Sequence, residues 1–148
     1  PGFYLFNLEQ TAHLPHYYYH KFDPEDEKSH RRSIYRFVVR SQPNPFMTTL
    51  DCADSSQSTP KRNETLTALQ ALSLLNNKFT LVMARHFADR LAGEKEKIAR
   101  QVELGFELVA GRPPSAKEQN LLSEYASEHG MANLCRSLFS LSEFAFID

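Results

Sequence analysis

Residues 62–77 decide the fold of this chain and read RNETLTALQALSLLNN. Two threonines typical of a helix start, Thr65 and Thr67, lead into an apolar run. Leucines recur in this run at helical spacing, at positions 69, 72 and 75. The pattern predicts a helix from Thr65 or Thr67 to Asn76, and its leucine and alanine content predicts that this helix is buried. The two asparagines at its end are expected to allow a left-handed turn.

Further helices are predicted on both sides of this one. Apolar periodicity and turn signals place them at residues 29–42, 78–92, 95–110, 115–129 and 131–141. Gly93 and Gly111 stand where C-terminal caps are expected, and Ser115-Ala116-Lys117-Glu118 has the form of a capping box. The short links favour antiparallel neighbours. The expected fold is all-α, an irregular bundle of about six helices.

Three stretches lack helical periodicity. Residues 1–28 are rich in Tyr, His and Pro and are expected to pack as an extension on the body or on missing parts of a parent protein. Residues 42–60 predict a long irregular crossover rich in Pro, Ser and Thr, and the tail 143–148 predicts a short extended segment. The expected organisation is therefore an extension over 1–28 and one helical domain over 29–148.

Composition indicates an ordinary single domain and gives no sign of a nucleic-acid-binding or membrane-spanning protein. The chain has 148 residues, 41% of them hydrophobic, which suits one domain with a single core. With 17 basic and 18 acidic residues the net charge is -1, which favours neither nucleic acid nor an acidic membrane surface as a partner. No apolar run approaches the roughly 20 residues of a membrane span. The start has neither an initiator Met nor the basic region of a signal peptide, so we expect a piece of a longer protein.

The residues add up to a family resemblance. Its segments are RRSIY at 31–35, the loop that ends in Arg62, TALQALSLLN at 67–76, ELVAGRPP at 107–114 and SEFAFID at 142–148. In this order they resemble the C-terminal conserved domain, of unknown function, of planctomycete-type secreted proteins that often carry a cytochrome c domain. Two positions depart from the family pattern: the usual Thr-Pro-Leu-Gln reads Thr-Ala-Leu-Gln at 67–70, and the usual Asn before the final Glu-Phe is Ser142.

The resemblance implies a module rather than a reaction. Such domains have no assigned activity and usually end a large exported protein, periplasmic, in the cell envelope or extracellular, in bacteria rich in polysaccharide-degrading systems. The implied partners are the remaining N-terminal domains of the parent. The covalent haem motif Cys-x-x-Cys-His is absent from the chain, so we expect no cofactor in this piece.

Histidines in the first thirty residues are weak candidates for a metal site. His13, His16 and His20 lie with acidic residues nearby, but the stretch is broken by prolines and lacks the fixed helix face that His-Glu-x-x-His provides. We favour ordinary surface or packing histidines and expect no metal.

A basic set offers the best candidate for anion or ligand binding. Guanidinium groups suit sulfate, phosphate or carboxylate because they donate paired hydrogen bonds. If a pocket exists, its residues are expected to be Arg31, Arg32, Tyr35, Arg62 and Gln70, possible contributors to a polysaccharide hydrolase or lyase whose remaining groups lie elsewhere in the parent. We favour the alternative that the arginines pair with Asp51, Asp54 and Glu64 and so fix the irregular loop.

Neither cysteine predicts catalysis. Cys135 sits at an apolar helix position and is expected to be a core thiol, and no Ser, His and acid occur in a recognisable order. Cys52 and Cys135 are compatible with one disulfide, two thiols or pairing with absent segments. The sequence therefore favours a structural or interaction module, and it leaves open whether the chain takes part in an enzyme.

Overall fold

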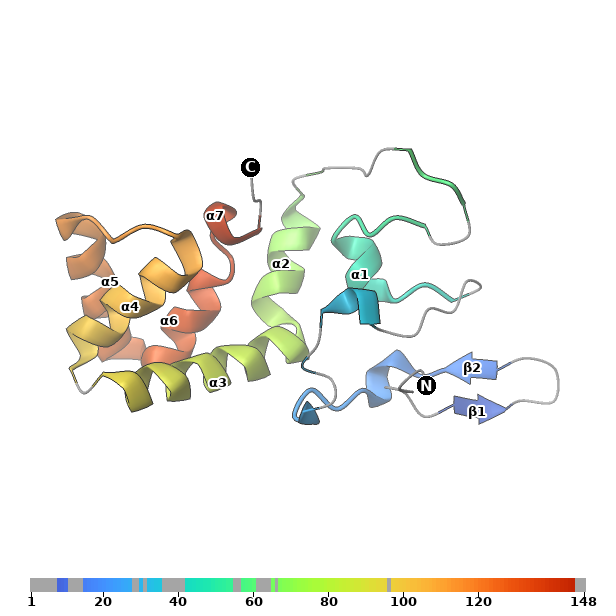
Figure 1. The fold of residues 1–148 in the computed structure, drawn as a ribbon, viewed down its shortest axis with the longest axis horizontal. Helices are drawn as coiled ribbons and strands as arrows, with labels where there is room; N and C mark the ends of the chain where they lie inside the picture. The colour runs from blue at the N-terminus through green and yellow to red at the C-terminus, as the bar shows by residue number, and fades with distance from the viewer. Residues whose placement is uncertain are drawn as a thin grey trace. The chain divides into compact units, whose positions relative to one another are not determined.

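The computed structural model describes residues 8–10, 15–27, 30, 32–35, 42–54, 57–60, 65, 67–95 and 97–145. The chain divides into two compact units, Pro1–Gln70 and Ala71–Asp148. The division falls inside one helix, because α2 spans Ala68–Asn76 (Figure 1). The expected boundary at residue 28 stays a prediction.

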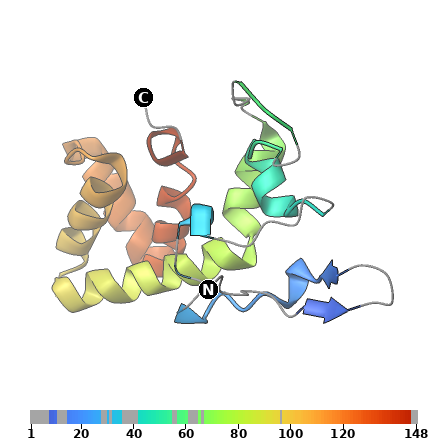
Figure 2. The same ribbon diagram turned by 45° about the vertical axis from the view of Figure 1, so that its right-hand side comes forward.

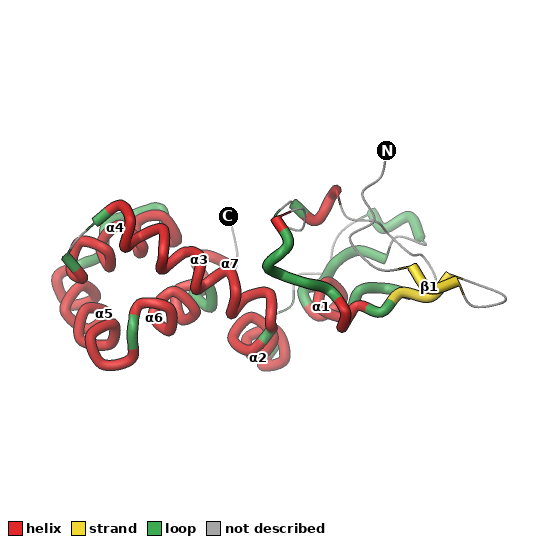
Figure 3. Tube along the Cα trace, turned by 90° about the horizontal axis from the view of Figure 1, so that it is seen from below, coloured by secondary structure: helices red, strands yellow, loops and turns green. Residues whose placement is uncertain are grey.

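In the described residues of the first unit, the elements that precede α2 are short. Strands β1 (Leu8–Gln10) and β2 (Pro15–Tyr17) pair antiparallel, with Glu9 opposite His16, and appear in yellow in Figure 3. Single 3-10 turns cover Tyr19–Lys21 and Ser33–Tyr35. The second turn lies inside the helix predicted over 29–42, and residues 36–41 of that prediction fall outside the described part of the chain.

A short helix, α1, lies in the stretch that was predicted to be an irregular crossover. It spans Pro45–Thr49, and its N-cap Asn44 accepts hydrogen bonds from the backbone N–H groups of Phe46 (3.0 Å) and Met47 (3.3 Å). Pro45 occupies the first helical position, where the N–H that proline lacks has no intrahelical partner anyway. The prediction of irregular structure is wrong for these five residues because it overlooked the Asn-Pro start signal.

The second unit is a helical body. After the end of α2 come α3 (Lys78–Glu94), α4 (Ile98–Ala110), α5 (Ala116–His129), α6 (Met131–Leu138) and α7 (Ser142–Ala145). Figures 1 and 2 both show α3 running past α4 and α6, and α4, α5 and α6 pack on one another. The predicted all-α, multi-helix fold is confirmed, and the short hairpin is added to it. Among the described residues, no helix has the length and apolar character that crossing a membrane requires.

Two neighbouring clusters make up the core of this body. One contains Val102, Phe106, Ala126, Leu134 and Leu138, and the other contains Ala84, Ala88, Leu91 and Cys135. Gly105 lies where α4 meets α3, since a methyl group added to it would come within 2.9 Å of Leu91 Cδ1. Glycine at position 105 therefore serves the close approach of α4 to Leu91, rather than backbone freedom.

Most helix ends in this unit follow the predicted signals. Gly111 ends α4 in the left-handed conformation with φ 69°, and the Ser115 and Glu118 side chains form the expected capping box at the start of α5. Gly93 does not end α3 as predicted, because the helix continues through Glu94 and is capped by Lys95. The tail also differs, since Glu143–Ala145 belong to α7 rather than to an extended segment, and residues 146–148 lie outside the description.

Helix α2 differs most from expectation. Leu69 and Leu72 are 62% and 55% exposed, whereas the buried residue of the helix is the polar Gln70. The prediction that this leucine-rich helix is buried is therefore wrong for the structure. Its end is also not a left-handed turn: Asn77 has φ -64° and is the N-cap of α3, where its side chain accepts a hydrogen bond from Phe79 N at 2.9 Å.

An arginine from α6 holds the C-terminal end of α2. Arg136 Nε donates to the carbonyl oxygen of Leu75 at 2.6 Å, and its Nη2 donates to Asn76 Oδ1 at 2.8 Å. The last carbonyl groups of a helix have no intrahelical partner, so a guanidinium placed here satisfies one of them and complements the negative end of the helix dipole.

Candidate functional site

The start of α2 carries a capping box that sequence analysis did not identify. Gln70 N donates to Thr67 Oγ1 at 3.2 Å, and Thr67 N donates to Gln70 Oε1 at 3.0 Å. This is the reciprocal Thr-x-x-Gln arrangement that satisfies two backbone donors of a first helical turn. The loss of the usual proline at residue 68 therefore leaves a well-defined helix start.

Asp51 joins this capping box to form what we call the α2 start cluster: Asp51, Thr65, Thr67 and Gln70. Asp51 Oδ2 accepts hydrogen bonds from Thr65 N and Thr65 Oγ1, each at 2.7 Å, and from Gln70 Nε2 at 2.9 Å. Gln70 Nε2 also donates to Thr65 Oγ1 at 2.9 Å. Asp51 and Thr65 lie 14 positions apart in sequence, so the cluster closes the crossover loop at its base.

The backbone of Asp51 is in the left-handed region, with φ 56°. Asp tolerates this conformation better than most residues, but it still carries a conformational cost that the surroundings must offset. The three hydrogen bonds to Oδ2 provide that compensation, because carboxylate acceptors make the stronger class of hydrogen bond. The cluster therefore has a clear local role in fixing the loop and the beginning of α2.

This arrangement constrains what Gln70 can do. The residue is 9% exposed, its amide oxygen accepts from Thr67, and its amide nitrogen donates to both Asp51 and Thr65. In the described structure its polar groups serve the chain itself. The prediction that Gln70 binds an anion stays untested, and binding would require the amide to exchange these partners for a ligand.

The other predicted anion-binding residues are only partly visible. Arg32 and Tyr35 lie together at the turn Ser33–Tyr35, where Tyr35 N donates to the Arg32 carbonyl oxygen at 3.0 Å, and both residues are exposed. Arg31 and Arg62 lie outside the described residues, as does Glu64, which was expected to pair with arginine. Among the described contacts, Asp51 fixes the loop through its hydrogen bonds with Thr65 and Gln70.

The histidine candidates are placed only by their backbone. His16 lies on β2 and His20 in the first 3-10 turn, but their side chains, and the whole of His13, fall outside the description. His30 Nε2 lies 2.9 Å from the carbonyl oxygen of Pro24. Within the described residues, no group of three or more His, Cys, Asp or Glu side chains is arranged to hold a metal ion. The predicted absence of a metal site stays a prediction.

An ion-pair network in the second unit was not foreseen. Arg112 donates to both oxygens of Glu118, at 2.8 and 3.1 Å, and to Glu143 Oε1 at 3.1 Å. The hydrogen bond from Arg112, followed by those from Ser115, lowers the pKa of Glu118 to about 2. The carboxylates of Glu118 and Glu143 in turn raise the pKa of Arg112. The guanidinium also stacks 4.8 Å from the Phe106 ring centre. The network ties the start of α5 to α7.

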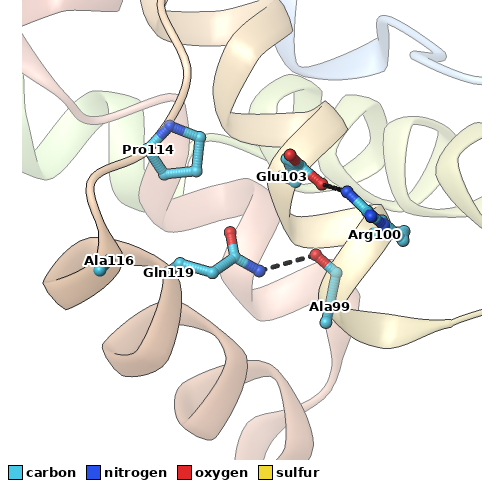
Figure 4. Close-up of a pocket in the computed structure, with 6 residues that line it drawn as sticks. All are labelled: Ala99, Arg100, Glu103, Pro114, Ala116 and Gln119. Carbon is cyan, nitrogen blue, oxygen red and sulfur yellow. Dashed lines mark hydrogen bonds and ion pairs between the residues drawn. The ribbon is translucent and has the colours of Figure 1, made fainter.

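A shallow hollow of about 340 Å³ lies between the first turns of α4 and the start of α5 (Figure 4). Gln119 crosses this gap and donates from Nε2 to the Ala99 carbonyl oxygen at 2.7 Å and to Ser123 Oγ at 3.2 Å. Its Oε1 is buried without a hydrogen-bond partner, while Arg100 and Glu103 form an ion pair at the edge of the hollow. The hollow is thus bridged by the protein's own contacts.

The two cysteines occupy different environments. Cys135 is fully buried in the α3–α6 core cluster, and this burial raises the pKa of its thiol to about 12. The prediction of a core thiol is confirmed, and a thiol with such a pKa is a poor nucleophile near neutral pH. Cys52 is exposed, and both are free thiols in the structure.

Fold and site together define a helical domain whose described polar side chains mainly fix its own helix ends and loop. The chain belongs to the family described as "Protein of unknown function (DUF1553)", whose family model matches residues 6–126. This confirms the expected domain of unknown function. A search of the curated proteins and a search of the solved structures each gave no significant match. The planctomycete-type origin and the cytochrome c association stay predictions.

Proposed function

We propose that this domain is a structural or interaction module, the C-terminal part of a larger exported bacterial protein. The observation that supports the proposal is the apolar face of α2 with Leu69 and Leu72 exposed. No charged residue occurs between Thr65 and Asn77, and the polar Gln70 is the side chain that turns inward. An exposed apolar surface without charge suits contact with another protein surface.

The partner we propose is the remaining N-terminal part of the same parent protein, rather than a nucleic acid or a membrane. Fully burying one leucine contributes about 1.5–3 kcal/mol. Because Leu69 and Leu72 are each a little over half exposed, covering both would contribute about 2–3 kcal/mol, or about 30- to 150-fold in affinity. Export and a link to extracellular polysaccharide use belong to the proposal and rest on the family resemblance. The module is proposed to bring no cofactor of its own.

Hydroxyl-radical footprinting tests this proposal on the intact parent and on the isolated chain. Leu69 and Leu72 are expected to be labelled several-fold less in the parent, because its other domains cover them. Leu121 is a matched internal control, since it is 63% exposed and lies on a different helix, α5. Equal labelling of all three leucines in parent and isolated chain would contradict the proposal, as would a native product no larger than 17.0 kDa.

The second candidate function is a contribution to the anion-binding site of a polysaccharide-acting hydrolase or lyase. The supporting observation is that Arg32 and Tyr35 are both exposed at one turn. This function predicts that sulfated or uronic oligosaccharides raise the melting temperature, and that Arg32→Ala and Arg62→Ala each abolish the rise. A wild-type chain whose melting temperature does not respond to these sugars would exclude this role for the isolated domain.

A further inference from the structure

We draw no further inference here: the strongest candidate, the hollow between the first turns of α4 and the start of α5, carries nothing because its unpartnered atom, Gln119 Oε1, is fully covered and its charged residues, Arg100 and Glu103, pair with each other, so that nothing in the structure shows which ligand it would take.

Discussion

Replacing Gln70 by methionine removes the side-chain amide from the α2 start cluster while keeping length and good helix propensity. The variant loses the acceptor for Thr67 N and the donor to Asp51 Oδ2 and Thr65 Oγ1. Asp51 would then hold its left-handed backbone with fewer of the contacts that offset its cost. We therefore expect both the loop base and the first turn of α2 to loosen.

The expected magnitude follows from the three hydrogen bonds. Losing a cap of this kind costs about 0.5–2 kcal/mol, and a hydrogen bond to a charged group contributes about 1.5–3 kcal/mol. These values do not add fully, because the bonds share one cluster and the methionine side chain keeps its apolar packing. We expect a loss of about 2–3 kcal/mol in the free energy that protects the cluster from opening.

Amide hydrogen exchange, measured by NMR at Thr65 and Thr67, gives the free energy of this local opening. Gln57→Met is the matched control, because Gln57 lies in the same loop but is exposed, and among the described residues it bonds to nearby Asp54. The control should change protection by no more than about 0.5 kcal/mol. If Gln70→Met changes protection no more than the control does, the cluster does not fix α2 and Gln70 becomes available for the ligand role predicted from sequence.

Gln70→Glu sharpens the test through its pH dependence. Glutamate keeps the acceptor for Thr67 N but places a second carboxylate where an amide donor now lies 2.9 Å from Asp51 Oδ2. Two carboxylates at this separation raise the pKa of one of them in the folded state. The folded variant then binds more protons than the unfolded chain, so its stability should be lowest at neutral pH and recover as the pH falls. A variant with wild-type protection at pH 7 would refute the reasoning.

Three further predictions concern the helical body. Glu118→Gln keeps the capping box but removes a carboxylate whose pKa is about 2. The stability of the wild type should therefore fall relative to that of this variant as the pH drops from about 4.5 to about 2, as measured by circular dichroism. Native protein treated with a thiol reagent at pH 8 should be modified at Cys52 and not at Cys135, as peptide mass spectrometry would show; equal rates would contradict the buried, high-pKa thiol. In urea unfolding, Gly93→Ala should stabilise the protein by about 0.5–1 kcal/mol, since open space surrounds that helical site. Gly105→Ala should destabilise it by about 1 kcal/mol, because the added methyl group crowds buried Leu91. A stabilising Gly105→Ala together with a destabilising Gly93→Ala would argue against the described core.

Sequence patterns predicted the second unit well because its signals are local and agree with one another. The helix periodicity of residues 78–138, the Gly111 cap and the Ser115 capping box each depend on a few neighbouring residues. Gly93 is not a stop signal here because a single glycine costs a helix only about 1 kcal/mol, which the packing of the preceding helix, including buried Leu91, offsets.

The first unit and the candidate site were harder to predict because their decisive contacts join residues far apart in sequence. Asp51 reaches Thr65 and Gln70 across the crossover loop, and no periodicity marks that pairing. The Thr67-x-x-Gln70 capping box is different, since it is a four-residue pattern that can be recognised from sequence alone. The network of Arg112 with Glu118 and Glu143 likewise needs the fold to bring α7 to the start of α5.

The use of polar side chains bears on function. Residues that carry the family resemblance, including Thr67, Gln70 and Arg112, direct their hydrogen bonds to helix ends and to a loop base. Leucines of the same motif, Leu69 and Leu72, are left at the surface. Because burial of apolar surface drives most protein association, the proposed module would present α2 to a protein partner through these two leucines.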